Sequence, residues 1–592
     1  MTNDRTRDVA VVGSPSTNTE LTVDLLQEAT EERLVGALTA FEAVQNGQRI
    51  TSVGQIVGIE LRNRWHEDSV FRNLVKRTGE IPPITNRQDT RIADLVVGAT
   101  FRQTTDGFEP EVLGMVPPTG TRVHRVDQPI LDRLLEVYRS EIVYLGKAYA
   151  NDVLYPMWFK HFGSGAGGAG EAYHLGVFGK TGSGKSGLAK MMLCAYAQHP
   201  SLGILVIDPQ GEFTLELSGT RVGQQRLVLD HIMRDQGRAI QVYRISDIQL
   251  DEWQTFEEML VSLGFCEELT VTHSSNAVRA AEVIRNALER AHDQAGRARF
   301  PLAQLGARDA LREALNAILD QQSIQYIFPS REPRIRLQNR AQDIITNRLD
   351  EVFTNRWQPI AQLFAEGQNR RRLFGIVSDL MGTAGASGPR PVVVIDLSAR
   401  GNQGRLWTEE LERRLLGKLL NALIAQSTSS LSTQQSANVL VLLDEAHRHA
   451  PSGRLDADSE AERLRSLLRR AVRETRKYGI GWLFISQTLG GLDNDILQQL
   501  RILAFGFGLA MGTEFDRLRD FVGGDKRALE LYQSFRDPQS FPRRDLQEFP
   551  FMAVGPVSPL AFSGKPLFFT AFTDSEEFTR VNNLQIPPRS KG

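Results

Sequence analysis

Eight residues near position 180 have the types and the spacing needed to hold a nucleoside triphosphate. The run 179–186 reads GKTGSGKS and fits the pattern G-x-x-x-x-G-K-[ST] at every position. Glycine backbones can wrap a phosphate and aim several N–H groups at it, and a helix that begins there adds its positive end. We therefore expect Lys185 to reach the β- and γ-phosphates of ATP and Ser186 to ligate Mg²⁺. The other predicted nucleotide contacts are Gly179, Thr181, Gly182, Ser183 and Gly184.

Two adjacent acids follow an apolar run further along the chain. The segment 438–445 reads NVLVLLDE, an apolar strand that ends in Asp444 and Glu445, which is the Walker B pattern. Asp444 would hold the Mg²⁺ shell, and Glu445 would polarise the water that attacks the γ-phosphate. The alternative is a pair of carboxylates that cap a strand at the surface. The upstream phosphate loop favours the catalytic interpretation.

Polar side chains close two more of the predicted strands. Gln487 ends the run FISQ, where an amide can lie near the γ-phosphate and report hydrolysis. Asp208 ends another apolar run and opens DPQGEF, which also contains Glu212. Both acids would lie on the carboxyl edge of the sheet, where ligands of open α/β sheets bind. The alternatives are an ordinary strand-end glutamine and a helix-capping role for Asp208.

Arginines are dense in the segment 464–478, LRSLLRRAVRETRKY. Arg469, Arg473 and Arg476 recur at helical spacing on one face, a rigid placement that an arginine finger acting on a neighbouring subunit requires. A solvated basic face is the alternative for any one of them. A second basic region could follow a phosphate backbone, or could equally be a solvated face or a subunit contact. It contains Arg331, Arg334, Arg336, Arg340, Arg370, Arg371 and Arg372.

The elements that must position these residues are apolar runs after position 170. HLGVFG, LGILVID, VVVIDL, NVLVLLDE and IGWLFIS are apolar on both faces, as buried parallel strands are, and ILAFGFGLAM can add a sixth. Helical stretches alternate with them, which predicts an α/β fold with a parallel sheet. Short apolar runs broken by turn residues in the N-terminal part favour a small β-barrel or sandwich, although residues 34–44 fit a helix equally well.

These patterns divide the chain into five predicted segments. The strand signal disappears between positions 251 and 386, where amphipathic helices take over and indicate a large helical insertion. The predicted segments are an N-terminal β-barrel domain (1–150), the first part of the ATPase core (151–250), the helical insertion (251–386), the second part of the core (387–549) and an extended C-terminal tail (550–592).

Composition limits the class of protein. The 592 residues are too many for one small core, and 41% hydrophobic with 24% charged residues is ordinary for a soluble chain. Two cysteines exclude a disulfide framework and a four-ligand zinc site. A net charge of −2 means that any nucleic-acid contact must come from local arginine clusters. We find no signal-peptide core and no apolar run long enough to span a membrane, so we expect a cytoplasmic protein.

The order of these motifs resembles one family. A β-rich N-terminal domain, GKTGSGKS, DPQGEF, a helical insertion, VLLDEAH and RETRKYGIGWLFISQ are together similar to the HerA branch of the HerA–FtsK ATPases. The resemblance covers most of the chain. It implies a RecA-like core, a hexameric ring and ATP-driven movement along double-stranded DNA. It also implies an N-terminal barrel of the HAS type that docks a nuclease or another effector, as in DNA processing or phage defence.

The resemblance also assigns roles to single residues. It makes Lys185 and Ser186 the P-loop pair, Asp444 the Walker B acid, Glu445 the catalytic glutamate and Gln487 the polar sensor. Either Arg473 or Arg476 would be the trans-acting arginine. The expected cofactors are ATP and Mg²⁺.

Three other functions fit some of the same residues. An ATP-dependent hexameric scaffold could dock and activate an effector with little DNA translocation. The string Asp-Glu-Ala-His (444–447) occurs in monomeric superfamily-two helicases, but the hundred or so residues after Gln487 are too few for a second lobe. A packaging or secretion ATPase of the same superfamily would normally carry or attach to a membrane anchor.

Overall fold

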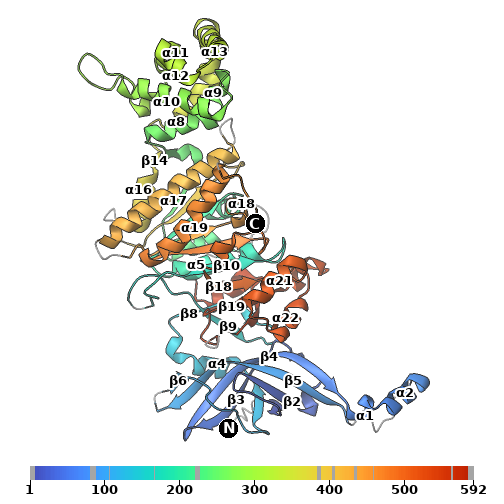
Figure 1. Ribbon diagram of the computed structural model, residues 1–592. Helices are drawn as coiled ribbons and strands as arrows, with labels where there is room; N and C mark the ends of the chain where they lie inside the picture. The colour runs from blue at the N-terminus through green and yellow to red at the C-terminus, as the bar shows by residue number, and fades with distance from the viewer. Residues whose placement is uncertain are drawn as a thin grey trace.

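The computed structural model describes residues 7–79, 88–105, 107–165, 167–220, 227–382, 388–402, 407–432, 436–457, 459–561 and 565–584. Figure 1 shows an elongated molecule in three tiers. The N-terminal strands form a barrel at one end, a large sheet with flanking helices forms the middle, and a purely helical tier forms the other end. The mixed α/β fold with an N-terminal barrel that the sequence predicts is confirmed.

The N-terminal tier is a closed barrel. Its strands follow the order β2-β1-β7-β3-β4-β5-β6, and an additional pairing of β2 with β5 closes six of them into a ring with β6 outside on β5. Side chains such as Val9, Phe41 and Leu95 fill the interior and are fully buried. The ambiguous segment 34–44 contains the start of strand β3. The bounds are β1 (Asp8–Val12), β2 (Glu20–Leu25), β3 (Leu38–Gln45), β4 (Gln48–Arg62), β5 (Thr90–Thr104), β6 (Gly107–Glu111) and β7 (Arg122–Arg125).

Strands β4 and β5 extend past the barrel and carry a short helical arm, α1 (Arg64–Glu67) and α2 (Ser69–Thr78), which points away from the body in Figure 1. Each of these two strands is 15 residues long.

The large sheet has eleven strands in the order β12-β15-β11-β16-β17-β10-β18-β19-β20-β8-β9. The first seven are parallel, and the last four join them in antiparallel pairs. All six apolar runs that predicted buried strands lie in the parallel part. The bounds are β8 (Ile142–Ala148), β9 (Leu154–Trp158), β10 (His174–Phe178), β11 (Gly203–Asp208), β12 (Ile240–Arg244), β15 (Val392–Asp396), β16 (Val439–Leu443), β17 (Ile480–Ser486), β18 (Leu500–Phe505), β19 (Phe549–Val554) and β20 (Leu567–Ala571).

Helices cover both faces of the parallel strands. Leu440 and Leu442 of β16 pack in one core, while Val441 and Leu443 pack in the other, which explains why this strand is apolar at every position. The first core includes helices α5 (Lys185–Ala197), α6 (Glu212–Leu217) and α7 (Leu229–Asp235). The second includes α16 (Leu373–Met381), α17 (Glu409–Ser432) and α19 (Glu460–Thr475).

The helical tier begins and ends at a two-residue strand pair, β13 (Ile248–Gln249) with β14 (Arg371–Arg372). Its centre is the fully buried indole of Trp357, which packs edge-on against Phe256 and Phe265. Two π-helical turns interrupt its last helix, at 344–348 and 353–357. Its helices are α8 (Trp253–Ser262), α9 (Phe265–Glu268), α10 (Ser274–Arg290), α11 (Arg308–Leu319), α12 (Gln321–Ile327), α13 (Arg331–Asp343), α14 (Leu349–Val352) and α15 (Gln358–Gln362).

The outer predicted segments need a correction, because parts of both belong to the large sheet. Strand β8, placed with the barrel in the sequence analysis, pairs with β20 of the predicted tail. Strands β19 and β20 are themselves almost wholly buried. Period-two patterning identifies strands but does not say which sheet they join. The helices not yet given are α4 (Gln128–Leu134), α18 (Ala446–His449), α20 (Asn494–Leu497), α21 (Gly512–Phe521), α22 (Lys526–Gln533) and α23 (Ser575–Val581).

Polar contacts fix the barrel on the middle tier. Gln55 of β4 exchanges two hydrogen bonds of 2.9 Å with the backbone of Phe568 in β20. Arg527 of α22 pairs with Glu60 and, at 2.7 Å, with Asp94 of the barrel strands. The barrel is therefore held by both the sheet and a helix of the middle tier.

Candidate ATP site

The glycine-rich loop lies between the buried strand β10 and helix α5, the context that a phosphate-binding loop requires. Gly182 and Gly184 have positive φ values of 84° and 89°, which side chains disfavour. A Cβ at Gly184 would also lie 2.6 Å from the ring of Phe549. Both conformation and space therefore require glycine here, and Lys185, near the end of the loop, begins helix α5.

Lys185 is nearly buried, with 8% of its surface exposed. Its Nζ donates a hydrogen bond of 3.0 Å to the carbonyl of Lys180, which closes the loop on itself. Burial lowers the pKa of Lys185, while the nearby Glu445 and Asp444 oppose that change. The ammonium group is thus held among acids and backbone carbonyls, where an anionic phosphate would be a favourable additional partner.

Asp444 follows the last residue of β16 and is 3% exposed. Burial, together with the charges of Glu445 and Asp208, raises its pKa to about 7. Ionisation of the Asp444 carboxyl is unfavourable without a nearby positive charge, and a bound cation would supply that charge. No group of three or more His, Cys, Asp or Glu side chains suited to a metal occurs in the described residues. One carboxylate and the Ser186 hydroxyl nevertheless suit Mg²⁺, which takes few protein ligands and keeps its phosphate and water ligands.

Glu445 is the centre of a hydrogen-bonded group. Its Oε1 accepts hydrogen bonds from Nε2 of Gln487 at 2.7 Å and from Nε2 of Gln210 at 3.0 Å. The amide oxygen of Gln487 in turn accepts a bond of 3.0 Å from the hydroxyl of Thr181 in the P-loop. The structure therefore brings together the predicted Thr181, Glu445 and Gln487, and adds Gln210. Sequence analysis missed Gln210 although it lies in the quoted DPQGEF run.

The other two acids of the carboxyl edge differ from each other. Asp208 is fully buried and accepts hydrogen bonds from the Gly211 and Thr214 backbones and from the Thr214 hydroxyl, at 2.7 to 2.8 Å. It caps helix α6, so its oxygens are already occupied and the capping alternative describes it. Glu212 lies beside the phosphate loop and pairs with the buried Lys190 at 2.5 Å.

A cavity of about 630 Å³ extends from the P-loop to these acids. One wall comes from the C-terminal part of the chain, which the sequence analysis did not connect with the nucleotide. Gln539 contacts Gly182, and Phe549 contacts Gly184. No local motif marks these residues, which lie in a short 3-10 helix (Pro538–Ser540), just before β19 and at its first position. The wall is lined by Pro538, Gln539, Gln547 and Phe549.

Sequence comparisons agree with this geometry. Residues 172–382 match the family model described as the central domain of helicase HerA. The DNA double-strand break repair helicase HerA of Pyrococcus furiosus is 22% identical over 349 residues, which cover 55% of this chain and 55% of that protein. The part of the chain that holds the P-loop and the helical tier is therefore similar to the central domain of helicase HerA. The chain spans about half the length of the curated relative that it matches.

Two solved structures are similar to this chain at lower sequence identity. VirB4 of Thermoanaerobacter pseudethanolicus is 14% identical, covers 73% of this chain and 96% of its own, and has a TM-score of 0.35. The genome packaging NTPase B204 of Sulfolobus turreted icosahedral virus 2 is 9% identical, covers 68% of this chain and 98% of its own, and has a TM-score of 0.28.

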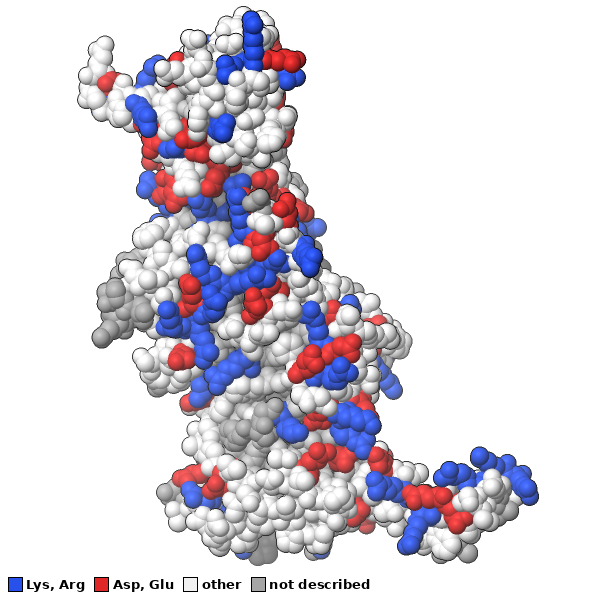
Figure 2. All heavy atoms as spheres, in the orientation of Figure 1, with Lys and Arg blue, Asp and Glu red and all other residues white. Residues whose placement is uncertain are grey.

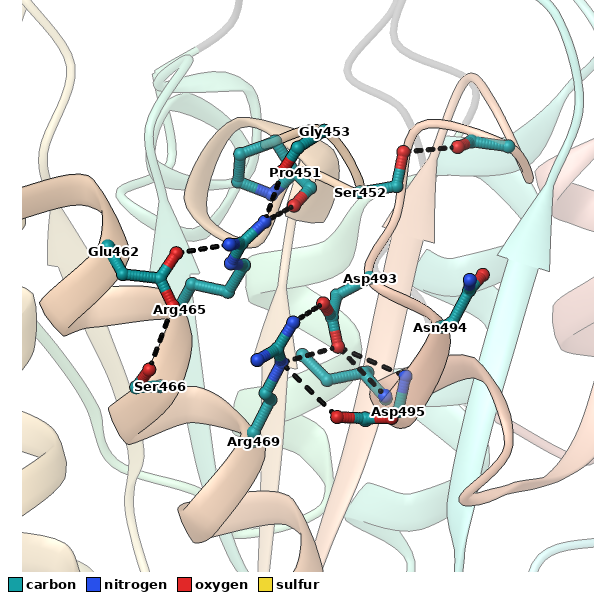
Figure 3. A network of polar contacts seen from close by, with 12 residues as sticks. Pro451, Ser452, Gly453, Glu462, Arg465, Ser466, Arg469, Asp493, Asn494 and Asp495 are labelled. Atoms are coloured by element: carbon teal, nitrogen blue, oxygen red, sulfur yellow. Dashed lines mark hydrogen bonds and ion pairs between the residues drawn. The ribbon is translucent and has the colours of Figure 1, made fainter. Parts of the chain in front are cut away.

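Two of the arginines of α19 make contacts within the middle tier (Figure 3). Arg469 donates to both carboxylate oxygens of the buried Asp493, at 2.9 and 2.5 Å. Arg465 donates to the carbonyls of Pro451 and Gly453, at 2.8 and 2.5 Å. The two pairs attach α19 to the loops that follow β16 and β17. The guanidinium group of Arg469 is therefore bound to a carboxylate of its own chain.

The remaining candidate fingers are exposed. Arg473 is exposed at the surface of α19, and Arg476 makes a pair of 3.1 Å with the exposed Glu171. Basic side chains gather over α17 and α19 in Figure 2. Among the described residues that line the ATP cavity there is no arginine. Neither Arg473 nor Arg476 therefore lies in the cavity of its own subunit.

The second basic region lies in the helical tier and is largely engaged locally. Arg340 pairs with Glu268 at 2.5 Å, and Arg334 donates to two backbone carbonyls. Arg370 donates to backbone carbonyls and Arg371 pairs with Asp379. Arg331 and Arg336 are exposed on α13.

No helix within the described residues combines the length and apolarity needed to cross a bilayer.

Proposed function

We propose that this ATPase assembles into a ring, most simply a hexamer, that hydrolyses ATP and translocates double-stranded DNA. One observation supports the assembly into a ring. The P-loop, Glu445 and Gln487 form a connected site at one sheet edge, yet no arginine lines that cavity among the described residues. An exposed arginine on α19 of a neighbouring subunit would complete the site, as trans-acting arginines do in other P-loop enzymes.

The chemistry of the site follows from its residues. Lys185 binds the β- and γ-phosphates, and the P-loop N–H groups hold the same oxygens. Ser186 and Asp444 would hold Mg²⁺, which would neutralise charge on the phosphates when bound. Glu445 accepts the proton of the attacking water, and Gln487 connects this base to the P-loop through Thr181.

The DNA part of the proposal is supported by the HerA match, whose curated relative is named a DNA double-strand break repair helicase. We further propose that the barrel tier docks a nuclease or another effector, in DNA processing or phage defence. Its place at one end of the molecule leaves it accessible beyond the ATPase tier (Figure 1).

The test is steady-state ATP hydrolysis with and without double-stranded DNA, combined with the mass of the particle in solution. We expect a ring-sized particle whose turnover rises several-fold with DNA and falls again at higher salt, because phosphate contacts release counterions. A ring that hydrolyses ATP at a rate indifferent to DNA would instead identify an effector-activating scaffold. A monomer with full turnover would refute the shared site.

A further inference from the structure

None of the residue roles given above includes Gln210, although its side chain contacts the proposed catalytic base. It lies in the turn between β11 and α6, and its side chain is exposed although the residues on both sides are buried. Its Nε2 donates a hydrogen bond of 3.0 Å to Oε1 of Glu445, a residue 235 positions away. The hydrogen bond therefore connects the end of β11 with the end of β16. It does so at a carboxylate oxygen of the proposed catalytic base.

The turn that presents Gln210 is held rigidly. The buried carboxylate of Asp208 accepts hydrogen bonds from the Gly211 and Thr214 backbones, on the far side of Gln210. Gly211 has a φ of 79°, and a Cβ there would lie 2.9 Å from the Ser398 hydroxyl. The run DPQGEF therefore forms a rigid turn. Gln210, the exposed residue in the middle of this turn, contacts Glu445 through its side chain.

Glu445 needs such support because its backbone is unfavourable. Its φ of 47° and ψ of 43° are left-handed, a conformation that costs a non-glycine residue about 1–2 kcal/mol. Its Oε1 receives both amide donors, and Oε2 receives neither of them. His447 approaches Oε2 at 3.4 Å, and burial lowers the pKa of this histidine.

The two amide donors are not equivalent. Gln487 is also bonded to Thr181 of the P-loop, so its position depends on how the loop holds the nucleotide. Gln210 instead donates to Glu445 from the turn that Asp208 holds in place. A γ-phosphate that attracts the Gln487 amide would leave Gln210 as the donor that still orients the carboxylate.

We propose that Gln210 is a positioning residue that holds Oε1 of the catalytic glutamate, so that its second oxygen is directed at the attacking water. The inference rests on the proposed function, in which Glu445 is the base. Loss of the Gln210 donor would let the carboxylate rotate among several orientations. Turnover would fall while ATP, which Gln210 does not hold, would bind as before.

The experiment compares the full-length protein with its Gln210→Met variant, which keeps the length of the side chain and removes the donor. We expect kcat to fall about tenfold, since a misplaced base loses part of the 10²–10⁴-fold that general bases contribute. The affinity for an ATP analogue and the midpoint of thermal unfolding should stay unchanged. Gln322→Met, at an exposed position of α12, is the matched control and should behave as wild type.

A double-mutant cycle separates positioning from a general structural effect. In a Glu445→Gln background the base is absent, so Gln210→Met should cost little further activity. Additive losses would overturn the proposal, and so would weaker ATP binding at unchanged kcat, which would place Gln210 on the nucleotide. Wild-type turnover in Gln210→Met would refute the inference alone. A wild-type protein without ATPase activity would refute the proposed function itself.

Discussion

Lys185 combines burial with a positive charge, and that combination makes its replacement informative. The side chain is 8% exposed, and its Nζ donates a hydrogen bond to the Lys180 carbonyl. Lys185→Ala should weaken ATP binding about 100-fold, or ~2.7 kcal/mol, because the phosphate charge loses its partner. Titration with a fluorescent ATP analogue measures the change. The exposed Lys180 in the same loop provides the control Lys180→Ala, which should bind normally; an equal loss in both variants would point to loop folding instead.

Replacement of Glu445 should slow ATP hydrolysis without weakening ATP binding. A glutamine at this position can still accept the two amide hydrogen bonds through its oxygen, so the loop geometry should persist. Glu445→Gln should therefore bind ATP like wild type while kcat falls about 100-fold or more. Single-turnover hydrolysis and analogue binding measure the two quantities. Glu366→Gln, an exposed residue of the helical tier, is the control, and normal turnover in Glu445→Gln would rule out the assigned base.

At the scale of elements, the contact of α17 with α18 buries an ionisable pair directly behind the Walker B strand. Nε2 of His449 lies 3.5 Å from Oε1 of Glu412, and both side chains are 3% exposed. Burial raises the pKa of Glu412 to about 7 and lowers that of His449 to about 3. His449 is therefore neutral at neutral pH, whereas Glu412 keeps its proton only below about pH 7.

This pair predicts a pH dependence of stability. The folded protein keeps the Glu412 proton up to about pH 7, whereas the unfolded chain releases it near 4.5. The folded state binds more protons between these values, so this group lowers the free energy of unfolding as pH rises. Glu412→Gln, which retains a donor toward His449, should raise the thermal midpoint of nucleotide-free protein at about pH 8.5 and change little at about pH 5.

The matched control for that experiment is Glu409→Gln, on the same helix but with an exposed side chain. Its effect on the midpoint should be small and the same at both pH values. A Glu412→Gln effect that is equal at acid and alkaline pH would show that packing, and not the buried charge, is responsible.

At the scale of the whole molecule, subunit mixing tests the shared site. Arg473 and Arg476 are exposed, and neither lines the cavity of its own chain. The alanine variant of the true finger should bind ATP but hydrolyse it poorly. Mixing it with Lys185→Ala subunits should restore part of the activity, because the defective P-loop subunit still supplies its arginine to an intact neighbour. The alanine variant of the other arginine should hydrolyse normally, and recovery in neither mixture would refute a trans-acting role.

Sequence alone was sufficient for the parts of this protein that are local. The P-loop is a continuous run whose glycines meet backbone requirements within eight residues, and the parallel strands are apolar at every position because both faces are buried. Gln487 and Glu445 could be predicted as site residues because they follow such strands by one and two positions. The helical insertion was visible as a change of hydrophobic period.

Tertiary structure decided everything that depends on which distant segments meet. Periodicity identified β8 and β20 as strands but could not pair them, since pairing is a property of two segments about 420 positions apart. Arg469 has the same helical spacing as Arg473, and only the position of Asp493 separates an internal anchor from an exposed side chain. Phe549 and Gln210 reach the site by long-range contact, without a local pattern. Local chemistry is encoded in adjacent residues, whereas contact geometry is set by the packing of the whole chain.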